Sequence, residues 1–164
     1  MADDTATGTD ERIEVTRAIP ADASAIFGVL RDPRGHVAID SSGMLMDATG
    51  DAVSAVGDTF VVHMDREALN DYPMGQYDVT VRITAFEPDR EIAWTILGQI
   101  EPPLGHVYGY RLEPGTDGTQ VTSYYDWSAA DPVWKDGGIF PVIPESALRA
   151  TLGILDRTVR SSKS

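Results

Sequence analysis

The chain of 164 residues contains no cysteine. This absence excludes disulfide bonds, thiolate nucleophiles and cysteine-ligated zinc or iron–sulfur sites. There is also no apolar run of about 18 residues, the length that a membrane-spanning helix requires, and the first residues lack the basic and apolar segments of a secretory signal. Lysine occurs only at Lys135 and Lys163, and such a preference for arginine is typical of high-GC bacteria. We therefore expect a bacterial cytoplasmic protein.

Basic residues are scarce, because 13 lysines and arginines stand against 26 aspartates and glutamates. The resulting net charge of −13 repels phosphate groups, which argues against binding to nucleic acids or to anionic membrane surfaces. Solubility is the simplest explanation for this charge. The hydrophobic content of 42% is that of an ordinary globular chain. We predict one domain over residues 11–162, preceded by a disordered acidic tail over residues 1–10.

The motifs of common catalytic and cofactor sites are missing from the sequence. It has no glycine-rich phosphate loop, no G-x-S-x-G elbow, no H-E-x-x-H zinc motif and no EF-hand loop. The histidines His36, His63 and His106 fall in three separate predicted elements, without the spacing of metal ligands. We therefore predict neither a metal site nor a cofactor.

The pattern of apolar residues predicts an α+β fold. Residues 13–19 alternate as a strand does, and two short helices follow over about 22–31 and 34–40. Alternation then continues between about 44 and 128, with turns between consecutive strands, as in an antiparallel sheet. A final helix begins near Pro144 and carries an apolar stripe. One long helix after such a sheet has only the concave face to pack on, an arrangement that tends to leave a hollow.

Aromatic residues give the clearest functional signal. Five of them share the inner face of the last three predicted strands, namely Trp94, Tyr108, Tyr110, Tyr125 and Trp127. Core packing explains any one of them, but buried indole and phenol groups need hydrogen-bond partners that a helix stripe of leucine and alanine does not offer. Water or a ligand would supply these partners. We therefore predict a ligand cavity between the sheet and the final helix.

Further residues complete the predicted site. Arg17 is a charged residue at an inner strand position, where it either meets a polar ligand group or forms a salt bridge. His36 and Asp40 lie either at the cavity mouth or in solvated loops. The full predicted lining consists of Arg17, Phe60, Met64, Trp94, Ile96, Tyr108, Tyr110, Tyr125, Trp127, Leu148, Leu152 and Leu155. No residue is assigned a catalytic role.

Several short sequence motifs occur in a characteristic order along the chain. They include FGVLRDP at 27–33, FEP at 86–88, YRLEP at 110–114 and YYDWS at 124–128. Over residues 11–160 the sequence thereby resembles the START/Bet v1-like (SRPBCC) superfamily, in particular its bacterial polyketide cyclase/dehydrase-like members. The resemblance implies the helix-grip fold. This fold is a curved antiparallel sheet of six to seven strands around a long C-terminal helix, with two short helices after the first strand and a deep hydrophobic cavity.

The resemblance implies little about chemistry, because the superfamily has no universal catalytic motif. Three hypotheses stay open. The first is a protein that binds a small hydrophobic molecule, such as an aromatic compound, a polyketide or a lipid. The second is a cyclase, aromatase or dehydratase that shapes its substrate in the same cavity. The third is a protein-interaction module without a ligand, which would use a strand edge or the segment 129–143 with Trp134 and Phe140.

Overall fold

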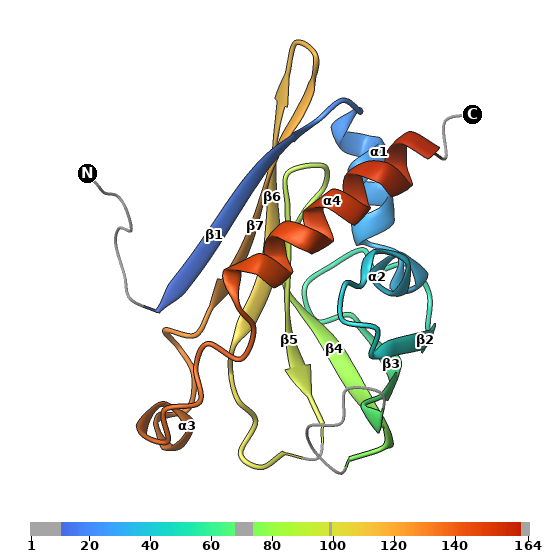
Figure 1. The fold of residues 1–164 in the computed structure, drawn as a ribbon. Coiled ribbons are helices and arrows are strands. Elements are labelled where there is room, and N and C mark those ends of the chain that lie inside the picture. The colour runs from blue at the N-terminus through green and yellow to red at the C-terminus, as the bar shows by residue number, and fades with distance from the viewer. Residues whose placement is uncertain (1–10, 68–73, 99, 162–164) are drawn as a thin grey trace.

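The computed structural model describes residues 11–67, 74–98 and 100–161. The predicted tail over 1–10 and the predicted domain end at residue 162 lie outside these residues. The described part of the chain forms one curved antiparallel sheet with the long helix α4 (Glu145–Ser161) across its concave side (Figure 1). The predicted α+β helix-grip architecture is confirmed.

The sheet has seven strands in the order β1-β7-β6-β5-β4-β3-β2. Their bounds are β1 Arg12–Ile19, β2 Leu45–Thr49, β3 Thr59–Asp65, β4 Gln76–Glu87, β5 Glu91–Leu97, β6 Val107–Gly115 and β7 Gly118–Asp126. The hairpin between β6 and β7 is tight, because the strands pair up to Gly115 and Gly118. A Cβ on Gly118 would lie 2.3 Å from the carbonyl oxygen of Ile19, so the close approach of β1 requires glycine there.

Four helices accompany the sheet in the described residues: α1 Ala23–Leu30, α2 Pro33–Ile39, α3 Pro132–Asp136 and α4. Helix α2 begins where the Asp32 side chain accepts a hydrogen bond from the backbone N–H of Arg34. The sequence analysis did not predict α3, although the same signal is present there. Asp131 accepts from the N–H of Val133, and proline occupies the first turn in both helices.

Helix α4 contacts mainly β1, β7, α1 and α2. The predicted apolar stripe, which consists of Leu148, Leu152, Leu155 and Val159, is buried in the common core. Asp156 is buried beside it and accepts hydrogen bonds from Arg17 at 2.9 Å and from Arg160 at 2.6 Å. Burial alone would raise the pKa of Asp156, but the two guanidinium groups outweigh it and hold that pKa below its usual value.

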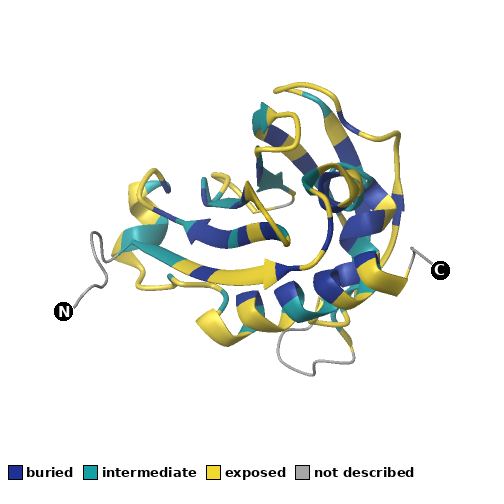
Figure 2. Ribbon diagram, turned by 90° about the horizontal axis from the view of Figure 1, so that it is seen from above, coloured by how far each residue is buried: buried dark blue, intermediate teal, exposed yellow. Residues whose placement is uncertain are grey.

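Residues on the inner face are fully buried at one end of the sheet and only half-buried at the other. In β4, Ile83 is buried and Tyr77 is half-buried. In β5, Ile92 is buried and Ile96 is half-buried. We call the end that holds Ile19, Ile83, Ile92, Val121 and Leu155 the packed end, and the end that holds Tyr77, Val79, Ile96 and Tyr108 the open end. Figure 2 shows buried and exposed residues alternating along the strands and along α4.

Candidate functional site

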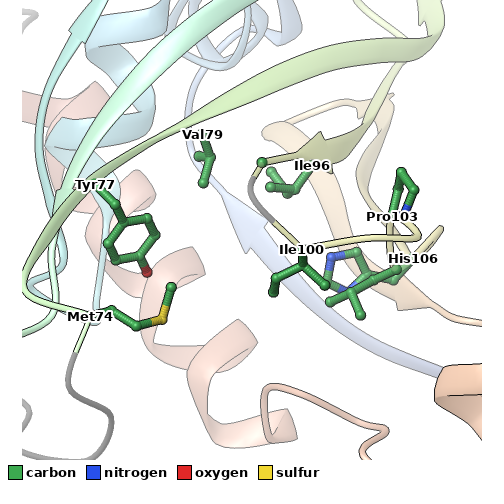
Figure 3. Close-up of a pocket in the computed structure, with 9 residues that line it drawn as sticks. Met74, Tyr77, Val79, Ile96, Ile100, Pro103 and His106 are labelled. Carbon is green, nitrogen blue, oxygen red and sulfur yellow. The ribbon is translucent and has the colours of Figure 1, made fainter.

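A cavity of about 60 Å³ lies at the open end. Its lining comes from β4, from the end of β5 and from the segment before β6. It consists of Met74, Tyr77, Val79, Ile96, Gly98, Ile100, Pro103, Leu104 and His106. Figure 3 shows Tyr77 and Met74 on one side of this cavity and His106 with Pro103 on the other. The walls are therefore mostly apolar, with one phenol and one imidazole among them.

The position of this cavity differs from the expected one. No residue of α4 is among the nine described lining residues, whereas the sequence analysis placed the cavity against that helix. The reason is the course of α4, which packs mainly on β1, β7, α1 and α2 and makes no comparable contact with β4 or β5. The space beneath α4 is occupied instead by core residues such as Leu152, Leu155 and Val159.

The cavity is smaller than an aromatic ring requires. A cavity of roughly 150 Å³ is known to hold benzene, against the 60 Å³ seen here. The side chains at its rim have room to move, however, because Met74 and Ile100 are 38% and 43% exposed. Methionine in particular changes its conformation at little cost in free energy. Outward movement of these two side chains would enlarge the cavity without disturbing the packed end.

His106 is the polar group with the most defined surroundings in this cavity. It is 3% exposed, and its Nδ1 lies 2.7 Å from the hydroxyl oxygen of Tyr125. Burial lowers the pKa of His106 to about 4, so the imidazole is neutral at pH 7. Burial raises the pKa of Tyr125, with a further contribution from nearby Tyr108 and an opposing one from the backbone N–H of Val142. Both groups are therefore uncharged at neutral pH.

The other inner aromatic groups differ in how their polar atoms are paired. Burial raises the pKa of Tyr110, and the Ser123 hydroxyl, which hydrogen bonds to the phenol, opposes this shift. Burial of its hydroxyl also raises the pKa of Tyr108. Within the described residues, the polar atoms of Tyr108, Trp94 and Trp127 have no hydrogen bond to protein. The predicted need for outside partners therefore holds for these three side chains.

The structure gathers only part of the predicted lining around the cavity. Ile96 lines it directly. Tyr108 and Tyr125 lie next to it through ring contacts with His106. The remaining predicted aromatic and aliphatic residues belong to the core or pack against it, namely Phe60, Met64, Trp94, Tyr110, Trp127, Leu148, Leu152 and Leu155. Whether any of them contacts a ligand stays a prediction.

Arg17, Asp40 and His36, for which the sequence left two interpretations open, all make contacts within the protein. Arg17 forms the ion pair with Asp156. Asp40 caps the turn after α2 by accepting from the N–H groups of Ser42 and Gly43. His36 is buried and packs edge-on against Trp94, with ring centroids 4.6 Å apart. None of the three is among the described residues that line the cavity.

A second hollow of about 380 Å³ lies at the packed end. Its lining combines α1 with the turn between β4 and β5 and consists of Ser24, Phe27, Gly28, Arg31, Ser54, Phe86, Pro88 and Asp89. Five of these eight residues are exposed, and the lining includes the charged side chains of Arg31 and Asp89. We therefore take the smaller apolar cavity on the inner face as the candidate site.

Other kinds of site find little support in the described residues. No three His, Asp or Glu side chains among them lie close enough together to hold a metal ion. None of their helices is both long and apolar enough to cross a membrane. Trp134 and Phe140, the residues of the interaction hypothesis, are held in place: the Trp134 indole donates to the carbonyl of Pro102, and Phe140 stacks on Trp127.

Several lining residues were not predicted from the sequence, although a signal for some of them is present. Tyr77 and Val79 continue the alternation of Val81 and Ile83, which places them on the inner face. His106 precedes Tyr108 by two residues and therefore shares its face. Gly98, Ile100, Pro103 and Leu104 follow no periodic pattern, so nothing in the sequence shows that they close one side of a cavity.

Comparison with known proteins agrees with this fold. The protein CV1439 of Chromobacterium violaceum is 15% identical with a TM-score of 0.67, and the comparison covers 92% of this chain and 98% of that one. A truncated norcoclaurine synthase of Thalictrum flavum is 16% identical with a TM-score of 0.63, over 91% and 92% of the two chains. At such identities the likeness shows the fold alone.

Sequence relatives extend the comparison. The uncharacterized protein Rv0088 of Mycobacterium tuberculosis is 29% identical over 128 residues, which are 77% of this chain and 51% of that protein. The chain thus spans about half the length of the curated relatives it matches. The family model described as "Polyketide cyclase / dehydrase and lipid transport" matches residues 10–160. The chain belongs to this family, within the SRPBCC superfamily.

Proposed function

We propose that this protein binds a small, uncharged, mostly apolar molecule at the open end of its sheet. The observation that carries the proposal is the cavity there, with its apolar walls and the single buried polar side chain of His106. Small-molecule sites commonly combine apolar walls with a few placed polar groups. The family description, which names polyketides and lipid transport, supports the same class of ligand.

The ligand enters between the rim residues. Met74 and Ile100 are exposed apolar side chains beside an apolar cavity, and a ligand that pushes them outward would cover them in turn. Such contact removes apolar surface from water, which favours binding by about 25 cal/mol per Å². An aromatic ring or a short acyl chain fits this description. A long polyketide would have to extend beyond the rim into solvent.

A second candidate function is catalysis in the same cavity, as a cyclase, aromatase or dehydratase. The observation that favours it is the pairing of His106 with Tyr125 in the cavity wall, and a fold neighbour named norcoclaurine synthase is an enzyme by its name. General acid–base catalysis works best when the pKa lies near the working pH. The pKa of His106 is about 4, and that of Tyr125 is raised. This makes binding the stronger candidate.

Thermal unfolding with an added aromatic probe tests the proposal. Acetophenone at tenfold its Kd should raise the Tm of the wild-type protein by roughly 3 to 6 °C. In the variant Gly98→Leu the new side chain would grow beside Val79, since a Cβ at Gly98 lies 3.4 Å from Val79 Cγ1. It should fill the cavity and abolish the shift.

Gly28→Leu is the matched control. It adds the same side chain on α1, where a Cβ meets nothing within 4 Å, and should leave the acetophenone shift unchanged. An absence of any shift in the wild type, or an equal shift in both variants, would contradict binding at the open end.

A further inference from the structure

The hydrogen bond between Tyr125 and His106 favours one tautomer of the neutral imidazole. The backbone N–H of Val142 acts on the Tyr125 oxygen as a donor and opposes the rise of its pKa, which favours the phenol O–H as a donor that needs an acceptor elsewhere. His106 Nδ1, at 2.7 Å, supplies one. A neutral imidazole that accepts at Nδ1 carries its hydrogen on Nε2. Since the pKa of His106 is about 4, the ring is neutral at pH 7.

The Nε2–H group of His106 is left without a protein partner. Within the described part of the chain, the only hydrogen bond that His106 makes through its side chain is the one at Nδ1. The side chain is more than nine-tenths buried and lines the cavity (Figure 3). A buried donor without an acceptor is costly, so natural structures pair such groups with protein, water or a ligand.

The other lining residues limit what the acceptor can be. None of the nine described residues around the cavity is an acid or a permanently charged base. A carboxylate or an ammonium group of a ligand would lose its hydration there without gaining a counter-charge. A neutral oxygen acceptor suffers no such loss. This leaves ketones, aldehydes, esters and phenols as the polar groups that suit the site.

We propose that His106 anchors the ligand by donating a hydrogen bond from Nε2 to a neutral carbonyl or phenol oxygen, and that Tyr125 positions the imidazole for this role. The inference rests on the proposed function and adds the polar group by which the ligand is recognised. Tyr125 acts through His106 and is a positioning residue.

Paired probes separate this inference from the proposed function. Acetophenone and ethylbenzene have the same shape and differ in a carbonyl against a methylene. Wild-type protein should bind acetophenone roughly 3- to 10-fold more tightly, the value of one neutral hydrogen bond. In His106→Phe this preference should disappear while the affinity for ethylbenzene is kept. Tyr125→Phe should retain only part of the preference, because the imidazole tautomer is no longer fixed.

The outcomes are distinct. If neither probe binds to the wild-type protein, the proposed function fails. If both bind equally well, or if His106→Phe keeps the preference, the proposed function stands and the anchoring role of His106 is overturned.

A measurement on the wild-type protein covers the case in which a variant does not fold. Long-range ¹H–¹⁵N correlation spectra of the histidine rings report which nitrogen is protonated. We expect His106 as the Nε2–H tautomer at pH 7, with the Hε2 resonance shifting when acetophenone is added and staying in place with ethylbenzene. A protonated Nδ1, or an Hε2 resonance that responds to both probes alike, would overturn the inference.

Discussion

The two ends of the inner sheet face have the same kind of sequence and very different surroundings. At the packed end, residues such as Ile83 and Ile92 belong to the common core and are 1% and 0% exposed. At the open end, Val79 and Ile96 continue the same strands on the same face, yet they are half-buried and border a cavity. Strand alternation decides which face a residue occupies. The covering helices decide whether that face is filled.

Each end also holds a buried histidine, and the two differ in their partners. At the packed end, His36 donates from Nε2 to the carbonyl of Leu30 at 2.8 Å and packs against Trp94 and Phe60. At the open end, His106 is held through Nδ1 by Tyr125 and lines the cavity. The Nε2–H of His36 is thus used inside the protein, whereas the proposed Nε2–H of His106 is available to a ligand. This difference gives the open end its proposed function.

The largest expected effect comes from acid and involves both histidines. Burial lowers the pKa of each from 6.5 to about 4, so the unfolded chain binds protons in this range that the folded chain does not. Their contribution to stability is therefore constant above about pH 7 and falls as the pH drops from 6.5 towards 4. Between pH 7.5 and pH 5 each histidine should cost about 2 kcal/mol, as measured by urea unfolding at both pH values.

Single replacements divide this acid effect between the two ends. His36→Phe and His106→Phe should each remove about half of the pH dependence. Titration of His106 near 6.5 in NMR spectra, with His36 still near 4, would show that the open end is solvated and that the burial described for His106 is wrong.

Two isoleucines of β5 compare the ends within one strand and one face. Ile92→Ala should lower the free energy of unfolding by about 3 kcal/mol, because this side chain is fully buried and its removal leaves a void in the core. Ile96→Ala should cost about 1 kcal/mol or less, since part of that side chain already borders the cavity and solvent. Guanidinium chloride unfolding measures both. Equal losses would contradict the distinction between the ends.

The ion pair beneath α4 gives a smaller effect confined to the packed side. Asp156→Asn removes the charge that Arg17 and Arg160 share and should cost about 1 to 2 kcal/mol. Glu145→Gln breaks an exposed pair with Arg149 on the same helix and should cost less than about 0.5 kcal/mol. Both variants should keep the Tm shift with acetophenone. Its loss in Asp156→Asn would show that α4 takes part in the site.

The fold was predictable from sequence because its information is local and repeated. Alternation identified the inner face of the strands, and the spacing of Leu148, Leu152 and Leu155 identified the buried side of α4. Helix α3 was missed even though Asp131 and Pro132 repeat the Asp-Pro signal that ends α1 and begins α2.

The site was predictable only in part, because it depends on what covers each strand. Ile96 was correctly placed on the inner face and lines the cavity. Leu152 and Leu155 were expected to line it as well, but α4 crosses towards β1 and β7 and buries them in the core. The role of His106 depends on Tyr125, 19 residues away in sequence and adjacent only through the pairing of β6 with β7.

Methyl NMR with ethylbenzene tests the central claim most directly. The account places a small apolar ligand among Val79, Ile96 and Leu104 at the open end. The methyl resonances of these residues should therefore shift during the titration, whereas those of Ile92, Leu152 and Leu155 should stay in place. Shifts at Leu152 and Leu155, or no shift at Val79 and Ile96, would contradict it.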